Sequence, residues 1–263
     1  MAGSATAERG ARQQESSGPP LVRRLDPRRL RTIIIALAVI LLGAGVTWLL
    51  YGSQWLRVDR VSVSGTEVLT PAQVREAAAV PVGSPLVSVD TGAIEERLRA
   101  KLRRIDSVDV TRSWPDGIGL KVTERTPVLL VRKGRNFVEV DDEGVRFATV
   151  SRAPKGVPLL EPELSPASSA SASLRRFGED RLVREAVRTV ASLPPAVARD
   201  TRVVKVRSYD DISLELSGGR TVAWGSTENG AAKSRTILAL MKASPDARHF
   251  DVSVPTAPAS AGS

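Results

Sequence analysis

The sequence TIIIALAVILLGAGVTWLLY, which runs from Thr32 to Tyr51, divides this chain of 263 residues into a short tail and a long patterned portion. The stretch has no charged residue and no proline. As an α-helix it would be about 30 Å long, which is the thickness of the hydrocarbon core of a bilayer. Its backbone N–H and C=O groups can pair within the helix, as a lipid environment requires. The stretch therefore predicts a transmembrane helix over residues 32–51.

The charges on either side of this helix predict its orientation. Residues 1–31 contain seven arginines and three acidic residues, a net charge of +4, whereas the other flank offers Arg57 and Arg60 with Asp59 between them. The positive-inside rule then places the N-terminus in the cytoplasm and the C-terminal portion outside. A cleaved signal peptide would have a shorter apolar core and a small-residue cleavage site. The sequence favours an uncleaved anchor over a signal peptide or a buried soluble helix.

Composition excludes several kinds of chemistry. The chain has no cysteine, which rules out disulfides, thiolate metal sites and a cysteine nucleophile, and its one histidine, His249, rules out a multi-histidine metal site within one chain. The formal net charge is +9. Such a charge is typical of a solvated basic surface, although it also suits an anionic lipid or wall polymer.

Residues 58–126 have the pattern of a small domain in the order strand, helix, helix, strand, strand, preceded by a linker at 52–57. Thr70-Pro71-Ala72-Gln73 is typical of a helix start, with Thr70 as N-cap, proline in the first turn and Gln73 closing a capping box. The second helix has an apolar stripe at four-residue spacing, formed by Ile94, Leu98 and Leu102. We expect the last two strands to form a hairpin around a turn at Trp114-Pro115-Asp116-Gly117.

Residues 127–255 predict a second domain of several strands and amphipathic helices, followed by a flexible tail over 256–263. Asp141-Asp142-Glu143-Gly144 ends in the glycine that a hairpin turn favours, so we interpret its carboxylates as solvated turn charges rather than as a metal or acid–base site. Residues 165–173 are rich in serine and alanine and indicate a loop. Residues 249–254 alternate in character and predict a final strand.

Taken together, these motifs resemble the FtsQ/DivIB family of bacterial cell-division proteins. The resemblance rests on a signal anchor followed by Val61-Ser62-Val63-Ser64-Gly65, the Thr70-Pro71 helix, Ser113-Trp114-Pro115-Asp116-Gly117, and Val122-Thr123-Glu124-Arg125-Thr126-Pro127. It implies an α+β fold: one N-terminal transmembrane helix, a β-α-α-β-β POTRA domain, and a mixed-sheet β domain with flanking helices. It also implies a non-enzymatic scaffold at the division septum of the cell membrane, which links early and late division proteins.

The resemblance further implies two small bitopic partners, of the FtsB/DivIC and FtsL kinds. A segment of the FtsB-like partner would add as a strand to an edge of the β domain, where main-chain hydrogen bonds supply the affinity. The expected contact residues lie on the final strand, its neighbouring strand and the last helix, and they are Phe250, Asp251, Val252, Ser253, Val254, Trp224 and Lys233. Neither a cofactor, a metal ion, a nucleic acid nor a small-molecule substrate is expected.

The residues themselves show no catalytic constellation. Serine catalysis would have to use His249, and no serine has the local sequence of a nucleophile elbow. Gly218-Gly219 lacks the lysine and the following helix of a phosphate-binding loop. Two alternatives stay open at this point: a POTRA-containing transport or chaperone protein for exported clients, and a membrane-anchored wall hydrolase. The first requires a following β-barrel for which about 130 residues are too few. The second requires convergent acid–base or metal-binding residues.

Overall fold

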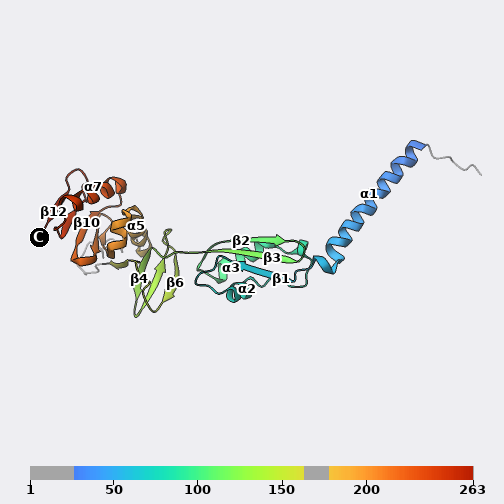
Figure 1. The fold of residues 1–263 in the computed structure, drawn as a ribbon, viewed down its shortest axis with the longest axis horizontal. Coiled ribbons are helices and arrows are strands. Elements are labelled where there is room, and N and C mark those ends of the chain that lie inside the picture. The colour runs from blue at the N-terminus through green and yellow to red at the C-terminus, as the bar shows by residue number, and fades with distance from the viewer. Residues whose placement is uncertain (1–26, 163–177, 263) are drawn as a thin grey trace, which may run out of the picture. The chain divides into compact units, whose positions relative to one another are not determined.

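A computed structural model of the chain describes residues 27–162 and 178–262 (Figure 1). Most of the predicted basic tail, residues 1–26, and the predicted loop at 165–173 lie outside the described residues. By its internal contacts the chain divides into two units, residues 1–53 and 54–263, and each is described by itself.

The first unit contributes the helix α1 (Pro27–Gly52), whose apolar side chains are exposed. In the described ranges, α1 is the one helix that is long and apolar enough to cross a membrane. It contains the whole of the predicted span and begins five residues before it, within the arginine-rich flank. The arginines at its start are followed at once by its apolar run, which is the arrangement expected of a membrane anchor.

The second unit opens with the predicted five-element domain. Its elements follow a short 3-10 turn, η1 (Gln54–Leu56), and include a second such turn, η2 (Leu86–Ser88); they are β1 (Arg60–Ser64), α2 (Pro71–Ala78), α3 (Thr91–Lys101), β2 (Ile105–Ser113) and β3 (Gly117–Glu124). The sheet order is β1-β3-β2, with β1 parallel and β2 antiparallel to β3. The capping box is confirmed, because Thr70 Oγ1 accepts from Gln73 N at 3.2 Å and Gln73 Oε1 accepts from Thr70 N at 2.9 Å. This domain has its own apolar core, to which α2, α3 and all three strands contribute.

Glu124 and Asp116, which lie in two of the motif segments, accept hydrogen bonds from distant parts of this domain. The Glu124 carboxylate accepts hydrogen bonds from the backbone N–H groups of the loop between β1 and α2, namely those of Glu67, Val68 and Leu69. In the hairpin turn, the carbonyl of Asp116 accepts from the N–H groups of Asp59 and Arg60 at the start of β1. Trp114 in this turn is 54% exposed. Gly65 has a φ of +80°, and a Cβ there would meet the carbonyl oxygen of Val122, so this position requires glycine.

The rest of the second unit forms one nine-stranded mixed sheet, in the order β12-β11-β10-β9-β8-β7-β4-β5-β6. Its strands are β4 (Leu129–Lys133), β5 (Asn136–Val140), β6 (Arg146–Val150), β7 (Leu159–Pro162), β8 (Thr201–Ser208), β9 (Asp211–Leu216), β10 (Thr221–Gly225), β11 (His249–Asp251) and β12 (Ala259–Ala261). Its helices are α5 (Glu179–Ser192), α6 (Pro195–Asp200), α7 (Gly230–Ala243) and the 3-10 turn η3 (Ser217–Gly219). The fold class is α+β, as the family resemblance implies.

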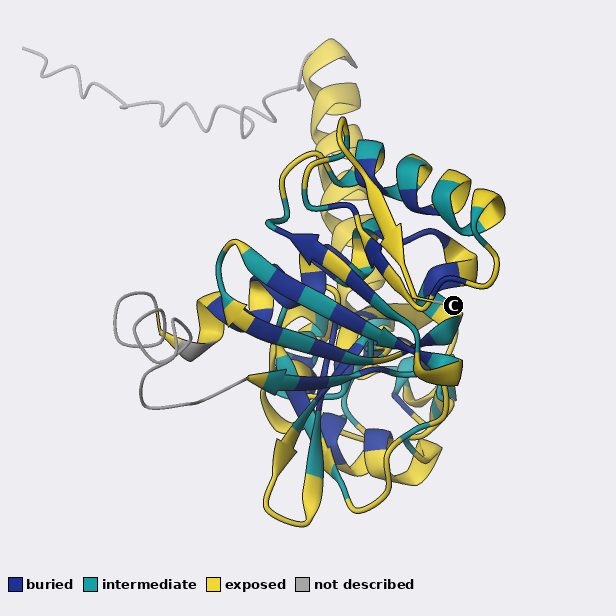
Figure 2. Ribbon diagram, turned by 90° about the vertical axis from the view of Figure 1, so that its left-hand side faces the viewer, coloured by how far each residue is buried: buried dark blue, intermediate teal, exposed yellow. Residues whose placement is uncertain are grey.

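One face of this sheet is covered and the other is open. The apolar side of α5 and Ile237 of α7 share a single core with the inward residues of β8, β9, β10 and β11. Buried residues alternate with partly exposed ones along these strands, as Figure 2 shows by its alternating dark-blue and lighter bands. Because successive residues of a strand point to opposite faces, the partly exposed set forms the open face. That face is bounded at its ends by two terminal strands, β12 and β6.

Two arginines of the POTRA-like domain pair with carboxylates of the sheet domain. Arg104 pairs with Glu139 on β5, and Arg125 pairs with Asp141 at the β5–β6 turn. Both carboxylates are buried, at 3% and 2% exposure. The expectation that the turn carboxylates are all solvated is therefore wrong for Asp141, because its side chain turns inward to accept from Glu143 N and Val145 N and to meet Arg125.

Candidate partner-binding edge

The predicted site lies at the C-terminal end of the chain, but the strand that forms the edge is not the predicted one. β11 pairs in parallel with β10, in the register Thr221↔His249, and β12 then pairs antiparallel with β11, in the register Phe250↔Ser260. The outermost strand is thus β12, from residues 259–261, which we expected to belong to a flexible tail. The Ala-Ser-Ala sequence of β12 is too short for its alternation to be informative and has no β-branched residue, so it carries no strand signal.

The predicted final strand also ends earlier than expected. Asp251 Oδ1 accepts hydrogen bonds from Ser253 N at 2.9 Å and from Ser253 Oγ at 2.7 Å. An aspartate that bonds the backbone two residues ahead favours a turn, which bends the chain out of the ladder. Val252 still donates from its N–H to Ala223 O at 3.0 Å, whereas Val254 is 55% exposed beyond the bend.

The seven predicted contact residues divide into buried and exposed groups. The side chains of Phe250, Val252, Trp224 and Lys233 are buried in the described structure, so they hold the edge in place and do not offer a surface to a partner. Asp251 and Val254 are exposed and Ser253 is partly exposed. Sequence alternation could not assign an apolar residue on this short strand to the core or to the surface.

Lys233 shows how the buried group supports the edge. Its Nζ donates to Trp224 O at 2.9 Å and to Ser226 O at 2.8 Å, which ties α7 to the end of β10. Burial lowers the pKa of this lysine, while the negative charges of Glu228 and Asp251 partly oppose that effect. The Lys233 side chain therefore holds the end of β10, the strand beside β11, against α7.

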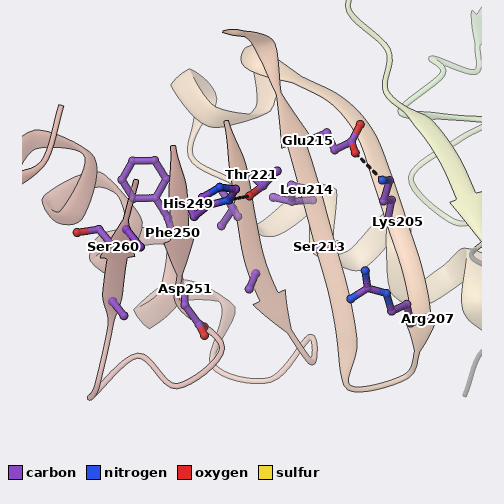
Figure 3. A pocket seen from close by; sticks show the side chains of 14 residues that line it. Lys205, Arg207, Ser213, Leu214, Glu215, Thr221, His249, Phe250, Asp251 and Ser260 are labelled. Atoms are coloured by element: carbon purple, nitrogen blue, oxygen red, sulfur yellow. Dashed lines mark hydrogen bonds and ion pairs between the residues drawn. The ribbon is translucent and has the colours of Figure 1, made fainter. Parts of the chain in front are cut away.

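On the open face, the last strands form a shallow hollow of about 360 Å³ (Figure 3). Thr221 Oγ1 and His249 Nδ1 lie 2.7 Å apart within it, and Lys205 pairs with Glu215 at 2.5 Å on its other side. The histidine thus has a hydroxyl partner across the β10–β11 ladder. In the described ranges no group of three or more histidine, aspartate or glutamate side chains is arranged to hold a metal ion.

The fold defines a class of protein: a chain with one candidate transmembrane helix in its described ranges, a small POTRA-type domain, and a nine-stranded mixed sheet. Comparison with known proteins gives the family. Residues 56–125 match the FtsQ-type POTRA domain, and residues 129–253 match the C-terminal domain of cell division protein FtsQ/DivIB.

Full-length relatives agree with these domain matches. Cell division protein FtsQ of Streptomyces coelicolor is 76% identical over 264 residues, which span all of both chains. FtsQ of Streptomyces collinus is 72% identical over the same length. FtsQ of Mycobacteroides abscessus is 31% identical over 229 residues, which cover 87% of this chain and 69% of that protein. The chain belongs to the FtsQ family of cell division proteins.

Proposed function

We propose that this chain is a non-enzymatic scaffold of the division apparatus. α1 fixes it in the cytoplasmic membrane at the septum, with the N-terminus inside and residues 54–263 outside. The POTRA domain (58–126) and the β domain (127–255) hold partners there, and these partners include small bitopic proteins of the FtsB/DivIC and FtsL kinds. Family membership supports the role in division, and the arginine-rich start of α1 supports the orientation.

The form of the β12 edge is the observation that supports the proposed partner site. β12 has three residues, all of them exposed and small, and its outer side is a terminal strand edge of the sheet. A partner strand can bond main chain to main chain along such an edge. The neighbouring hollow beside His249 and Asp251 can take side chains of the added strand.

A test of this site must use a change that leaves the fold of the β domain intact. Removal of the chain from Phe250 onward would delete core residues, and Val252→Pro would break the bond from Val252 N to Ala223 O inside the domain. Either change would unfold the edge for reasons unrelated to a partner. A photoreactive phenylalanine analogue in place of Ser260 avoids this difficulty, because β12 is exposed.

The experiment is photocrosslinking of full-length protein in its native membrane, with the same analogue in place of Lys121 as the control. Lys121 is exposed on β3 of the POTRA domain. We expect position 260, but not position 121, to form adducts with small bitopic coiled-coil proteins, identified by mass spectrometry. Adducts with exported client proteins alone, or the same adducts from both positions, would overturn the proposal.

A further inference from the structure

The other end of the nine-stranded sheet has a free edge of its own. β6 is the terminal strand there and pairs with β5 alone, in the register Val138↔Thr149 and Glu139↔Ala148. In the described parts of the chain, residues 147–150 make no backbone hydrogen bond outside this ladder. Within the described residues, the outer side of residues 147–150 therefore presents unpaired N–H and C=O groups, which are the template for an added strand.

A cationic hollow of about 620 Å³ lies against this edge. Four basic residues line it, namely Arg103 from the POTRA domain, Arg132 and Lys133 from β4, and Arg146 from β6, and no carboxylate does. Arg146 pairs with Asp180 at 2.5 Å. Arg103, Arg132 and Lys133 are exposed and have no ion pair with any described carboxylate, so their charges are available to a ligand.

Apolar side chains also line the hollow and narrow the choice of ligand. Val131, Val138 and Phe147 contribute to its surface between the cations. A phosphate polymer or a lipid headgroup would satisfy the arginines, but phosphate oxygens only accept hydrogen bonds and would leave the free C=O groups of β6 unpaired. An extended peptide supplies both donors and acceptors to a strand edge, apolar side chains for the valines, and carboxylates for the cations.

We propose that β6 and this hollow form a second docking edge, which takes an extended acidic segment of another protein. The segment adds as a strand outside β6, with acidic side chains toward Arg103 and Lys133 and an apolar side chain over Val138. Because a strand alternates its faces, residues two apart in the segment carry this recognition. The site lies at the opposite end of the sheet from β12, so it does not depend on the proposed partner site there.

The test measures binding of a fluorescein-labelled peptide to the full-length protein in detergent micelles, by fluorescence anisotropy. Every second residue of this peptide is glutamate or valine in turn, so that both kinds of side chain lie on one face of the added strand, and threonine fills the positions between them. Two control peptides separate the contribution of charge from that of main-chain hydrogen bonding. One replaces each glutamate with lysine, and the other keeps the sequence but carries N-methyl groups on alternate backbone nitrogens, which block strand pairing. We expect binding of the parent peptide and loss of binding with both controls.

Charge reversals in the protein give the matched comparison. Lys133→Glu should weaken binding of the parent peptide roughly tenfold, whereas Lys155→Glu, an exposed lysine that does not line the hollow, should leave it unchanged. Equal effects of the two reversals, or equal binding of the N-methylated peptide, would overturn the proposal. So would binding of inorganic polyphosphate or phosphatidylglycerol vesicles with sensitivity to Lys133→Glu while the peptide fails to bind.

Discussion

Lys233 is the most unusual single residue of the β domain, because its positive charge is buried and has no carboxylate in hydrogen-bond contact. Lys233 is 1% exposed, and both of its recorded hydrogen-bond acceptors are backbone carbonyls. Charge-assisted hydrogen bonds to carbonyls offset part of the cost of removing the ammonium group from water. The remaining cost appears as the lowered pKa of the lysine.

This lowered pKa predicts a pH dependence of stability. Below the folded-state pKa, both states keep the proton. Between that pKa and the ordinary value of 10.5, the folded state has released the proton while the unfolded state still holds it, so the free energy of unfolding rises with pH. Lys233→Met should remove this contribution, so the stability of the wild type relative to the variant should rise by up to about 1.4 kcal/mol per pH unit in that window.

Urea unfolding of the full-length chain in detergent, at several pH values up to 10.5, measures this difference. Trp224 is the reporter because it is buried while the other three tryptophans are exposed. Lys242→Met, at an exposed position of the same helix, is the control and should show no such slope. A constant difference between the wild type and Lys233→Met across the window would contradict the prediction.

At the scale of elements, the Glu124 carboxylate joins the end of β3 to the loop before α2. One side chain accepts three consecutive backbone N–H groups, at 2.8, 3.1 and 2.9 Å. Hydrogen bonds to an ionised acceptor are the stronger kind, and three donors on one carboxylate order a loop that has no regular structure of its own. The N-cap of α2 follows directly at Thr70, so this contact also fixes where the helix begins.

We predict that Glu124→Ala releases this loop while the POTRA core stays folded. Amide hydrogen exchange of residues 67–69 should accelerate roughly tenfold or more, because each N–H loses its acceptor. Thr123→Ala, an exposed neighbour on the same strand, is the control. Hydrogen exchange read by mass spectrometry on the full-length protein measures both. Unchanged exchange at 67–69 in Glu124→Ala would show that the loop is ordered by other contacts.

The elements that could be predicted from sequence are those with strong local signals. The capping box at Thr70, the helix α3 with Ile94 and Leu98 buried, and the hairpin of β2 and β3 all agree with the prediction. β12 was missed because its three small residues form a strand only by pairing with the otherwise open edge of β11. β7 was missed because it is a short strand held by parallel neighbours on both sides, β4 and β8, which are distant in sequence.

Which strands form the edges of the sheet could not be predicted from sequence, for the same reason. A strand edge is a property of pairing order, which depends on non-local contacts, whereas residue identity reports local preference. The family resemblance placed Phe250 and Val252 on a partner surface, whereas the domain uses both side chains in its own core. The free edge at β6 had no signal in sequence at all, since its exposure depends on β6 being last in the order.

At the scale of the whole molecule, buried ion pairs link the POTRA domain to the β domain. Each domain has its own core, so the contact between them depends on polar groups rather than on shared apolar packing. Arg125 meets Asp141 and also lies 3.4 Å from Asp106 and Glu143. A buried pair contributes little net stability, but loss of one partner leaves the other charge buried and uncompensated.

Arg125→Met should therefore lower the free energy of unfolding of the β domain by about 3 kcal/mol, because Asp141 keeps its buried charge without a cation. The double variant Arg125→Met with Asp141→Asn should recover part of that loss, since a neutral amide oxygen can still accept from Val145 N. Arg60→Met is the matched control: it also breaks an arginine–aspartate pair, at 2.5 Å, but the arginine side chain is 71% exposed, so stability should change little. Urea unfolding of the full-length variants, followed by Trp224 fluorescence, measures all three. If Arg125→Met and Arg60→Met behaved alike, the two domains would not be joined through Asp141, and the turn would be held by its own backbone bonds.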